Sequence, residues 1–140
     1  MYCCHSFDPM KNCDVLIIDD DFDDIEILME VLNKSGLEKV HYVYSAKEAF
    51  QYLEDVHPDC IPKVIVTDLH LPGVNGAEFI NHLKSLDKYK DVKVVVLSTA
   101  ISERHFEVFK ELRDHDCFSK PNDLAGFRKI AHRIRTHIEV

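Results

Sequence analysis

Four short apolar runs mark this chain, and each ends on a side chain that can bind a cation or a phosphoryl group. The runs are 15–18 before Asp19 and Asp20, 64–67 before Asp68, 94–97 before Ser98, and 117–119 before Lys120. Short runs rich in β-branched residues predict strands buried on both faces of a parallel sheet. In open α/β sheets, ligands bind beyond the carboxyl ends of the strands. The sequence therefore predicts three carboxylates, a hydroxyl and an ammonium at one edge, where they can hold a divalent cation and a phosphoryl group together.

Segments with helical periodicity separate the predicted strands. Regular alternation of strand and helix predicts an α/β fold with a parallel sheet and helices on both faces. Five strand–helix repeats favour the flavodoxin-like strand order 2-1-3-4-5, with five helices. The expected strands are 13–19, 40–44, 63–68, 92–97 and 117–119, and the expected helices are 22–35, one capped by Ser45, 77–86, one from near Ser102, and one from Asp123 to Ile138.

Chain length and composition limit the number of domains and the kinds of partner that this chain can have. Residues 1–11 show no periodicity and are expected to form a flexible tail, which leaves 12–140 as one domain. A formal charge of -8 argues against nucleic-acid binding, which needs a basic surface. No apolar stretch reaches the roughly 20 residues of a membrane span, and no signal peptide is visible. The irregular spacing of five cysteines is typical of reduced thiols, so a cytoplasmic location is expected.

The segment 19–24 carries five aspartates, which fall into two groups. Asp21, Asp23 and Asp24 fit the start of a helix, where acids interact favourably with the helix dipole. Asp19 and Asp20 do not fit this interpretation, because they lie at the end of a buried strand and would repel each other there. A hard divalent cation removes that repulsion, and Mg²⁺ prefers such oxygen ligands.

Asp68, Ser98 and Lys120 supply the chemistry expected at the same edge. A carboxylate such as Asp68 can attack phosphorus and form an aspartyl phosphate. The ammonium of Lys120 can pair with that carboxylate when it is free and with phosphate oxygens after transfer. Ser98 offers a hydroxyl donor to a phosphate oxygen.

These residues match the motifs of a known family. Over about residues 12–138, the chain resembles the receiver domain of two-component response regulators. Each motif alone is weak, but their order and their positions at predicted strand ends make the match specific. The matching segments are 16–21, 68–73 with Gly76, 96–100, and Lys120 with Pro121.

The resemblance implies a role for each residue of the site. Asp68 would be the phosphoacceptor in a Mg²⁺-dependent reaction. Asp20, Asp68 and the backbone carbonyl of His70 would bind Mg²⁺ directly, whereas Asp19 would reach the ion through a water molecule. Ser98 and Lys120 would hold the transferred phosphoryl group.

The resemblance also implies the reaction partners. The phosphoryl donor would be a phosphohistidine on a histidine kinase or a phosphotransfer protein. The protein would then be a phosphoacceptor in a signalling relay rather than an enzyme, with slow self-dephosphorylation as its own reaction. In the family the peptide bond before the matching proline is often cis, which Pro121 permits.

One position departs from the family pattern. An aromatic residue usually lies three positions before the lysine and swings inward when the hydroxyl moves. Here Cys117 occupies that position, and Phe118 follows it. Side chains alternate along a strand, so Phe118 is expected to point to the opposite face. The signal is then expected to be transmitted by another route.

The chain is expected to act as a stand-alone receiver that docks to another protein. The last two helices and the fifth strand form the usual face for a partner protein or for a second copy of the chain. Four basic side chains on the last helix would place positive charge there: Arg128, Lys129, Arg133 and Arg135.

Three alternatives remain open from sequence. A haloacid-dehalogenase phosphatase also uses a strand-end aspartate, but it needs a second aspartate where this chain has His70. A flavodoxin-like carrier shares the fold, but the acids from Asp19 to Asp21 would repel a flavin phosphate. A binding module that keeps the fold without switching is the third alternative, and the complete set of site residues argues against it.

Overall fold

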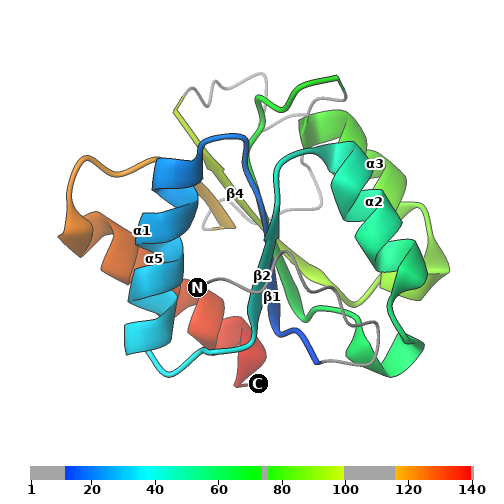
Figure 1. Cartoon of the computed structure of the whole chain (residues 1–140), viewed down its shortest axis with the longest axis horizontal. Coiled ribbons are helices and arrows are strands. Elements are labelled where there is room, and N and C mark those ends of the chain that lie inside the picture. The colour runs from blue at the N-terminus through cyan, green and yellow to red at the C-terminus, as the bar shows by residue number, and fades with distance from the viewer. Residues whose placement is uncertain (1–11, 74–75, 100–115, 140) are drawn as a thin grey trace.

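The computed structural model describes residues 12–73, 76–99 and 116–139, which form a five-stranded parallel sheet between two layers of helices (Figure 1). The strand order is β2-β1-β3-β4-β5, as predicted from the sequence. The strands are β1 (Val15–Ile18), β2 (Val40–Val43), β3 (Val64–Thr67), β4 (Lys93–Ser98) and β5 (Cys117–Ser119). The described helices are α1 (Phe22–Lys34), α2 (Ala46–Asp55), α3 (Gly76–Lys84) and α5 (Leu124–Ile138).

The alternating side chains of the strands build a separate core on each face. Leu16, Ile18 and Ile65 pack under α2 and α3, whereas Val15 and Ile17 pack under α1 and α5. Both faces are apolar because a parallel sheet is covered on both sides. The predicted α/β fold is therefore confirmed. The expected tail 1–11 and the expected helix from near Ser102 lie outside the described residues.

The helices begin where the sequence places capping residues. The Asp21 side chain accepts a hydrogen bond from the Asp23 N–H, Ser45 accepts one from Glu48, and Asp123 accepts one from Gly126. These side chains satisfy N–H groups that have no partner within the helix. In the described part of the chain, no helix has both the length and the apolar character needed to cross a membrane.

The strand register brings the predicted site residues to one edge. Ile18 pairs with Thr67, so Asp19 and Asp68 follow neighbouring strands at the same level. β4 extends beyond the end of β3, and its last residue, Ser98, pairs with Ser119 of β5. The Lys120 N–H then donates to the Ser98 carbonyl at 2.9 Å, which fixes the start of the lysine side chain beside the strand end.

Gly76 allows α3 to start directly against the loop that follows β3. Its N–H donates to the Leu69 carbonyl at 2.9 Å. A Cβ at this position would lie 2.3 Å from the Asp68 carbonyl oxygen and 2.7 Å from the Leu69 Cα. Only glycine fits so close to the backbone of the predicted phosphoacceptor.

We expect Gly76→Ala to destabilise the protein by about 1–3 kcal/mol, because backbone atoms must move to accept the new methyl group. Helix propensity alone predicts the opposite sign, a stabilisation of about 1 kcal/mol. Urea unfolding measures the change. Asn81→Ala on the exposed side of α3 is the control and should change stability by less than about 0.5 kcal/mol. A stabilised Gly76→Ala variant would contradict the close approach.

Candidate functional site

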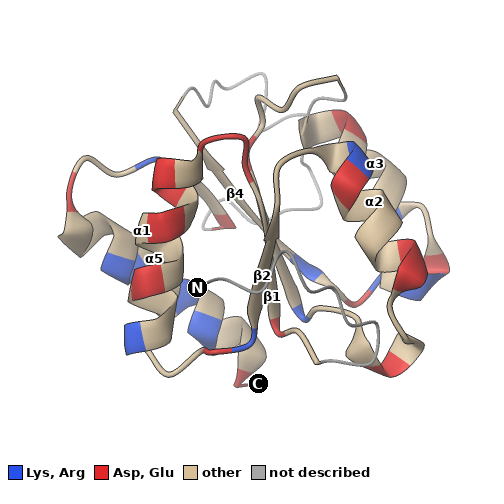
Figure 2. Cartoon of the chain, viewed as in Figure 1, with Lys and Arg blue, Asp and Glu red and all other residues tan. Residues whose placement is uncertain are grey.

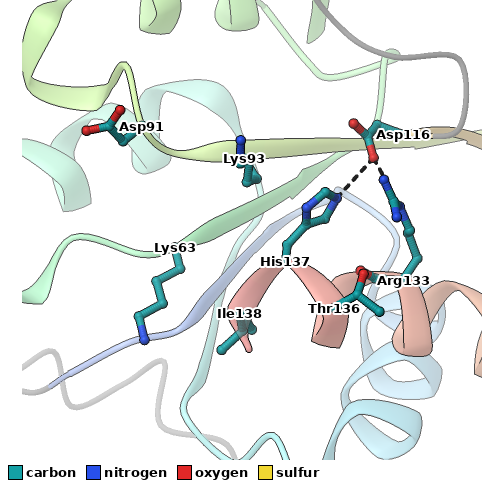
Figure 3. Close-up of a pocket in the computed structure, with 8 residues that line it drawn as sticks. All are labelled: Lys63, Asp91, Lys93, Asp116, Arg133, Thr136, His137 and Ile138. Atoms are coloured by element: carbon teal, nitrogen blue, oxygen red, sulfur yellow. Dashed lines mark hydrogen bonds and ion pairs between the residues drawn. The ribbon is translucent and has the colours of Figure 1, made fainter. Parts of the chain in front are cut away.

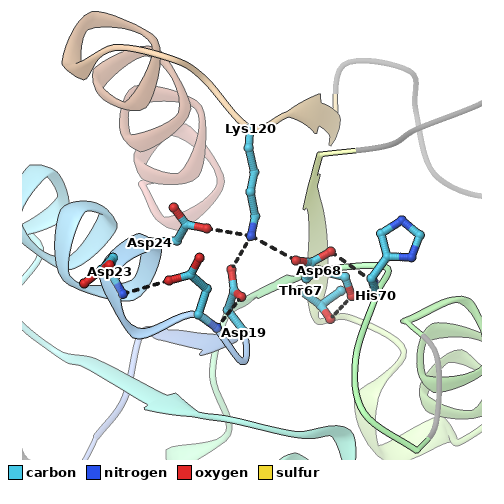
Figure 4. A network of polar contacts seen from close by, with 8 residues as sticks. Asp19, Asp23, Asp24, Thr67, Asp68, His70 and Lys120 are labelled. Carbon is cyan, nitrogen blue, oxygen red and sulfur yellow. Dashed lines mark hydrogen bonds and ion pairs between the residues drawn. The ribbon is translucent and has the colours of Figure 1, made fainter.

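Lys120 lies at the centre of a cluster of acids at the carboxyl edge of the sheet (Figure 4). Its Nζ is 2.7 Å from Asp24, 2.9 Å from Asp68 and 3.0 Å from Asp19. The side chains of Lys120, Asp19 and Asp68 are each exposed by less than a tenth. The structure thus brings together Asp19, Asp68 and Lys120, which are far apart in sequence and which the sequence analysis placed at neighbouring strand ends.

Backbone donors orient the two buried carboxylates. Asp19 Oδ1 accepts from the Asp21 N–H at 2.9 Å, and Asp68 Oδ1 accepts from the His70 N–H at 3.0 Å. The second oxygen of each acid contacts Lys120. Each carboxylate is therefore held by one fixed backbone donor and one side-chain cation.

Burial and pairing act in opposite directions on the ionisation of this cluster. Burial raises the pKa of Asp19 to about 6, although the Asp21 N–H and Lys120 favour its charged form. Burial alone would lower the pKa of Lys120, but hydrogen bonds with Asp24, Asp68 and Asp19 raise it above its ordinary value. The lysine therefore remains charged at neutral pH.

Three of the acids also form a group that can bind a cation. Asp19, Asp20 and Asp68 each offer a carboxylate oxygen, and these oxygens lie within 4.8 Å of one another. Asp20 is exposed, so the group opens to solvent on one side. Because the donors are all oxygens and the local charge is negative, the set fits a hard ion such as Mg²⁺.

The Ser98 hydroxyl is a buried polar group at the end of β4. Ser98 is fully buried, and within the described residues its Oγ has no hydrogen-bond partner. An unpaired buried hydroxyl costs stability. A hydroxyl that is left unpaired at the strand end is available to donate a hydrogen bond to a ligand. A phosphoryl oxygen could accept that hydrogen bond.

Asp24 is a member of the cluster that the sequence analysis missed. The sequence placed it with Asp21 and Asp23 as an acid at a helix start. Asp21 does cap α1 and Asp23 is exposed, but Asp24 contacts Lys120. Local periodicity cannot reveal this contact, because it depends on α1 packing beside α5 and the loop before it.

Cys117 and Phe118 point to opposite faces of the sheet, as predicted. Cys117 packs against the core under α2 and α3, and Phe118 packs against the core under α1 and α5. The peptide bond before Pro121 is trans, unlike the cis bond common in the family. A Cβ at Gly126 would lie 2.4 Å from the Pro121 Cβ, so the start of α5 also packs closely on this loop.

A hollow of about 580 Å³ lies at the opposite edge of the sheet from the acids, where the strands begin (Figure 3). There the buried Asp116 is 3.0 Å from the His137 ring and 3.4 Å from Arg133 Nε. Arg135 is paired with Glu139. Two of the four basic side chains expected on a docking face are therefore engaged within the chain, while Arg128 and Lys129 are exposed.

Comparisons with known proteins match this chain to one family. The sequence model of the response regulator receiver domain matches residues 15–132. The sporulation initiation phosphotransferase F of Bacillus subtilis is 28% identical over 119 residues, which cover 85% of this chain and 90% of that protein. The two-component response regulator ARR7 of Arabidopsis thaliana is 30% identical over 86% of this chain, which spans 61% of that longer protein.

Solved structures show the same architecture. The phosphorylated cyanobacterial phytochrome response regulator RcpA superimposes with a TM-score of 0.76 at 27% identity, over 92% of this chain and 95% of that one. A two-component response regulator from Legionella pneumophila gives a TM-score of 0.71 at 26% identity, over 89% of this chain and 99% of that one.

We expect Asp19→Asn to stabilise the protein at pH 7.5 by about 1–3 kcal/mol when divalent ions are removed by EDTA. In the unfolded chain Asp19 ionises near pH 3.8, whereas in the fold it ionises near pH 6. Between these values the folded state holds the extra proton, so this group makes stability fall as the pH rises.

Urea unfolding from pH 4 to 8 measures this dependence in the wild type and in Asp19→Asn. Asp23→Asn, an exposed neighbour, is the control and should keep the wild-type slope. Identical slopes in the wild type and in Asp19→Asn would contradict the assigned burial of this charge.

Proposed function

The chain belongs to the response regulator receiver family, and we propose that Asp68 accepts a phosphoryl group from a phosphohistidine on a histidine kinase or a phosphotransfer protein. The observation that supports this proposal most directly is the ion pair between Asp68 and Lys120 at 2.9 Å. Ser98 lies at the end of the neighbouring strand β4, and within the described part of the chain its buried hydroxyl has no hydrogen-bond partner. These groups are the nucleophile and the two donors that an aspartyl phosphate requires.

In the transfer, one Asp68 oxygen bonds to phosphorus while the bond between phosphorus and the donor imidazole breaks. The His70 N–H holds the other side of the carboxylate, so the nucleophile is oriented before the donor arrives. Lys120 prevents the neighbouring acids from repelling the incoming phosphoryl group.

The acids from β1 and β3 supply the cation site. We assign Asp20, Asp68 and the His70 carbonyl as direct ligands of Mg²⁺, and Asp19 as an acid that reaches the ion through water. When bound, the ion neutralises negative charge on the phosphoryl oxygens during transfer. Asp20 contributes charge from the solvent side, where a donor protein would approach.

After transfer, Ser98 and Lys120 bind the new phosphoryl oxygens. The aspartyl phosphate carries about -1.5 to -2 units of charge in place of the single negative charge of the free carboxylate. The Ser98 hydroxyl gains an acceptor, and the Lys120 N–H bond that pointed to Asp68 turns to a phosphoryl oxygen. Because the Lys120 backbone is bonded to the Ser98 carbonyl, both groups move with β4 and β5 and shift a two-state equilibrium.

The signal leaves through a face that includes β5 and α5, where a downstream protein or a second copy of the chain would dock. Cys117 is too small to reproduce a moving aromatic ring, so transmission relies on the backbone of β4 and β5 rather than on a ring swing. This signalling role places the protein in the cytoplasm, as a phosphoacceptor rather than an enzyme acting on a separate substrate.

We expect the protein to gain one phosphoryl group on incubation with acetyl phosphate and Mg²⁺, measured by intact mass. Asp68→Asn should abolish the adduct, because an amide is a poor nucleophile. Ser98→Ala should slow its formation by roughly a hundredfold to a thousandfold, the range for removal of one transition-state donor. An adduct that survives in Asp68→Asn would contradict the assignment.

Beryllofluoride, a phosphoryl mimic, separates switching from simple binding. Amide shifts in β4 and β5 on its addition would support a switch, whereas shifts restricted to the acid cluster would favour a module that binds partners without switching.

We expect Asp20→Asn to weaken Mg²⁺ binding by about tenfold or more, since it removes a charged ligand. Calorimetry measures the affinity directly, which suits a chain without tryptophan. Asp23→Asn changes the net charge equally and should bind Mg²⁺ as the wild type does. Equal losses in both variants would show a diffuse charge effect instead of a ligand.

A further inference from the structure

Asp24 contacts Lys120 without belonging to the group that can bind a cation. Of the three acids within 3.0 Å of the Lys120 Nζ, Asp19 and Asp68 are members of that group. Asp24 instead comes from the first turn of α1 and approaches the ammonium from the opposite side to Asp68 (Figure 4). Its side chain is 23% exposed, so it is partly screened from water.

These contacts occupy the whole donor capacity of the lysine. An ammonium has three N–H donors, and here three carboxylates lie at hydrogen-bonding distance. The shortest contact, at 2.7 Å, is the one to Asp24. A phosphoryl group on Asp68 can accept the Lys120 N–H that now points to Asp68. The negative charge of Asp24 still stays beside the ammonium.

We propose that Asp24 is a positioning residue that restrains Lys120 and thereby weakens the binding of a phosphoryl group at Asp68. The proposal rests on the proposed function of Asp68 as phosphoacceptor. Asp24 competes for the same positive charge and repels the phosphoryl oxygens across the lysine. The phosphorylated state is therefore less favourable in this chain than the other site residues alone would make it.

A purely structural role for Asp24 predicts a different result. Acids in the first turn of a helix stabilise it through the helix dipole, and Asp23 shares that position without contacting Lys120. If Asp24 served only the helix, its replacement would lower stability without tightening phosphoryl binding. If it served only as an anchor for Lys120, replacement would weaken phosphoryl binding.

The test measures beryllofluoride affinity in Mg²⁺ by calorimetry on the full chain. We expect Asp24→Asn to bind the mimic about 3- to 30-fold more tightly, the scale of one unit charge removed at several ångströms in a partly buried site. Asparagine keeps an oxygen acceptor for Lys120, so the change isolates charge. Asp23→Asn should bind as the wild type does, and Asp24→Glu, which retains the charge, should stay close to it.

The outcomes separate this inference from the proposed function. Unchanged or weaker binding by Asp24→Asn, with a normal wild-type affinity, overturns the inference and leaves the phosphoacceptor role intact. Failure of the wild type to bind the mimic or to accept phosphate overturns both. Thermal unfolding verifies that each variant folds, and Asp24→Ser, which also removes the charge, must show the same tightening if Asp24→Asn is unstable.

Discussion

The site depends on the ion pairs that the ammonium of Lys120 forms with three carboxylates. The ammonium lies within 3.0 Å of carboxylates that arrive from the end of β1, from the first turn of α1 and from the end of β3. Asp19 and Asp68 are almost completely buried, and without a cation between them their charges would repel in a medium that screens weakly. The ion pairs of Lys120 also connect the loop before α5 to α1 and to the ends of β1 and β3.

The sheet supports this concentration of charge. Its strands are apolar on both faces and form the stable core, and they place polar groups only at their ends. The pairing of Ile18 with Thr67 sets Asp19 and Asp68 side by side, and Gly76 lets the backbone of α3 touch the carbonyl of Asp68. The buried hydroxyl of Ser98, which has no hydrogen-bond partner among the described residues, lies at the end of the adjacent strand β4.

Contacts near both of its ends hold the helix α5 against the rest of the chain. Near its start, Gly126 packs against Pro121, which follows the central lysine. Near its end, Arg133 and His137 hold the buried Asp116 just before β5. Two basic side chains that looked available for a partner, Arg133 and Arg135, are therefore engaged in ion pairs within the chain. A partner that docks on this helix would also meet Arg128 and Lys129, which are exposed.

The sequence by itself determined the fold and predicted most of the residues that meet at this edge of the sheet. Runs of β-branched residues and helical spacing specify the alternation of strands and helices, which favours the observed strand order, and residues of the predicted site lie at or just beyond the ends of β1, β3, β4 and β5. These signals are local in the chain, so they can be read without coordinates. Tertiary packing alone decided the contact of Asp24 with Lys120 and the close approach of Gly76. It also decided that the Ser98 hydroxyl has no partner among the residues that the structure describes. These features depend on how α1, α3 and the loop before α5 settle on the sheet, and distances between elements are not encoded in any local period.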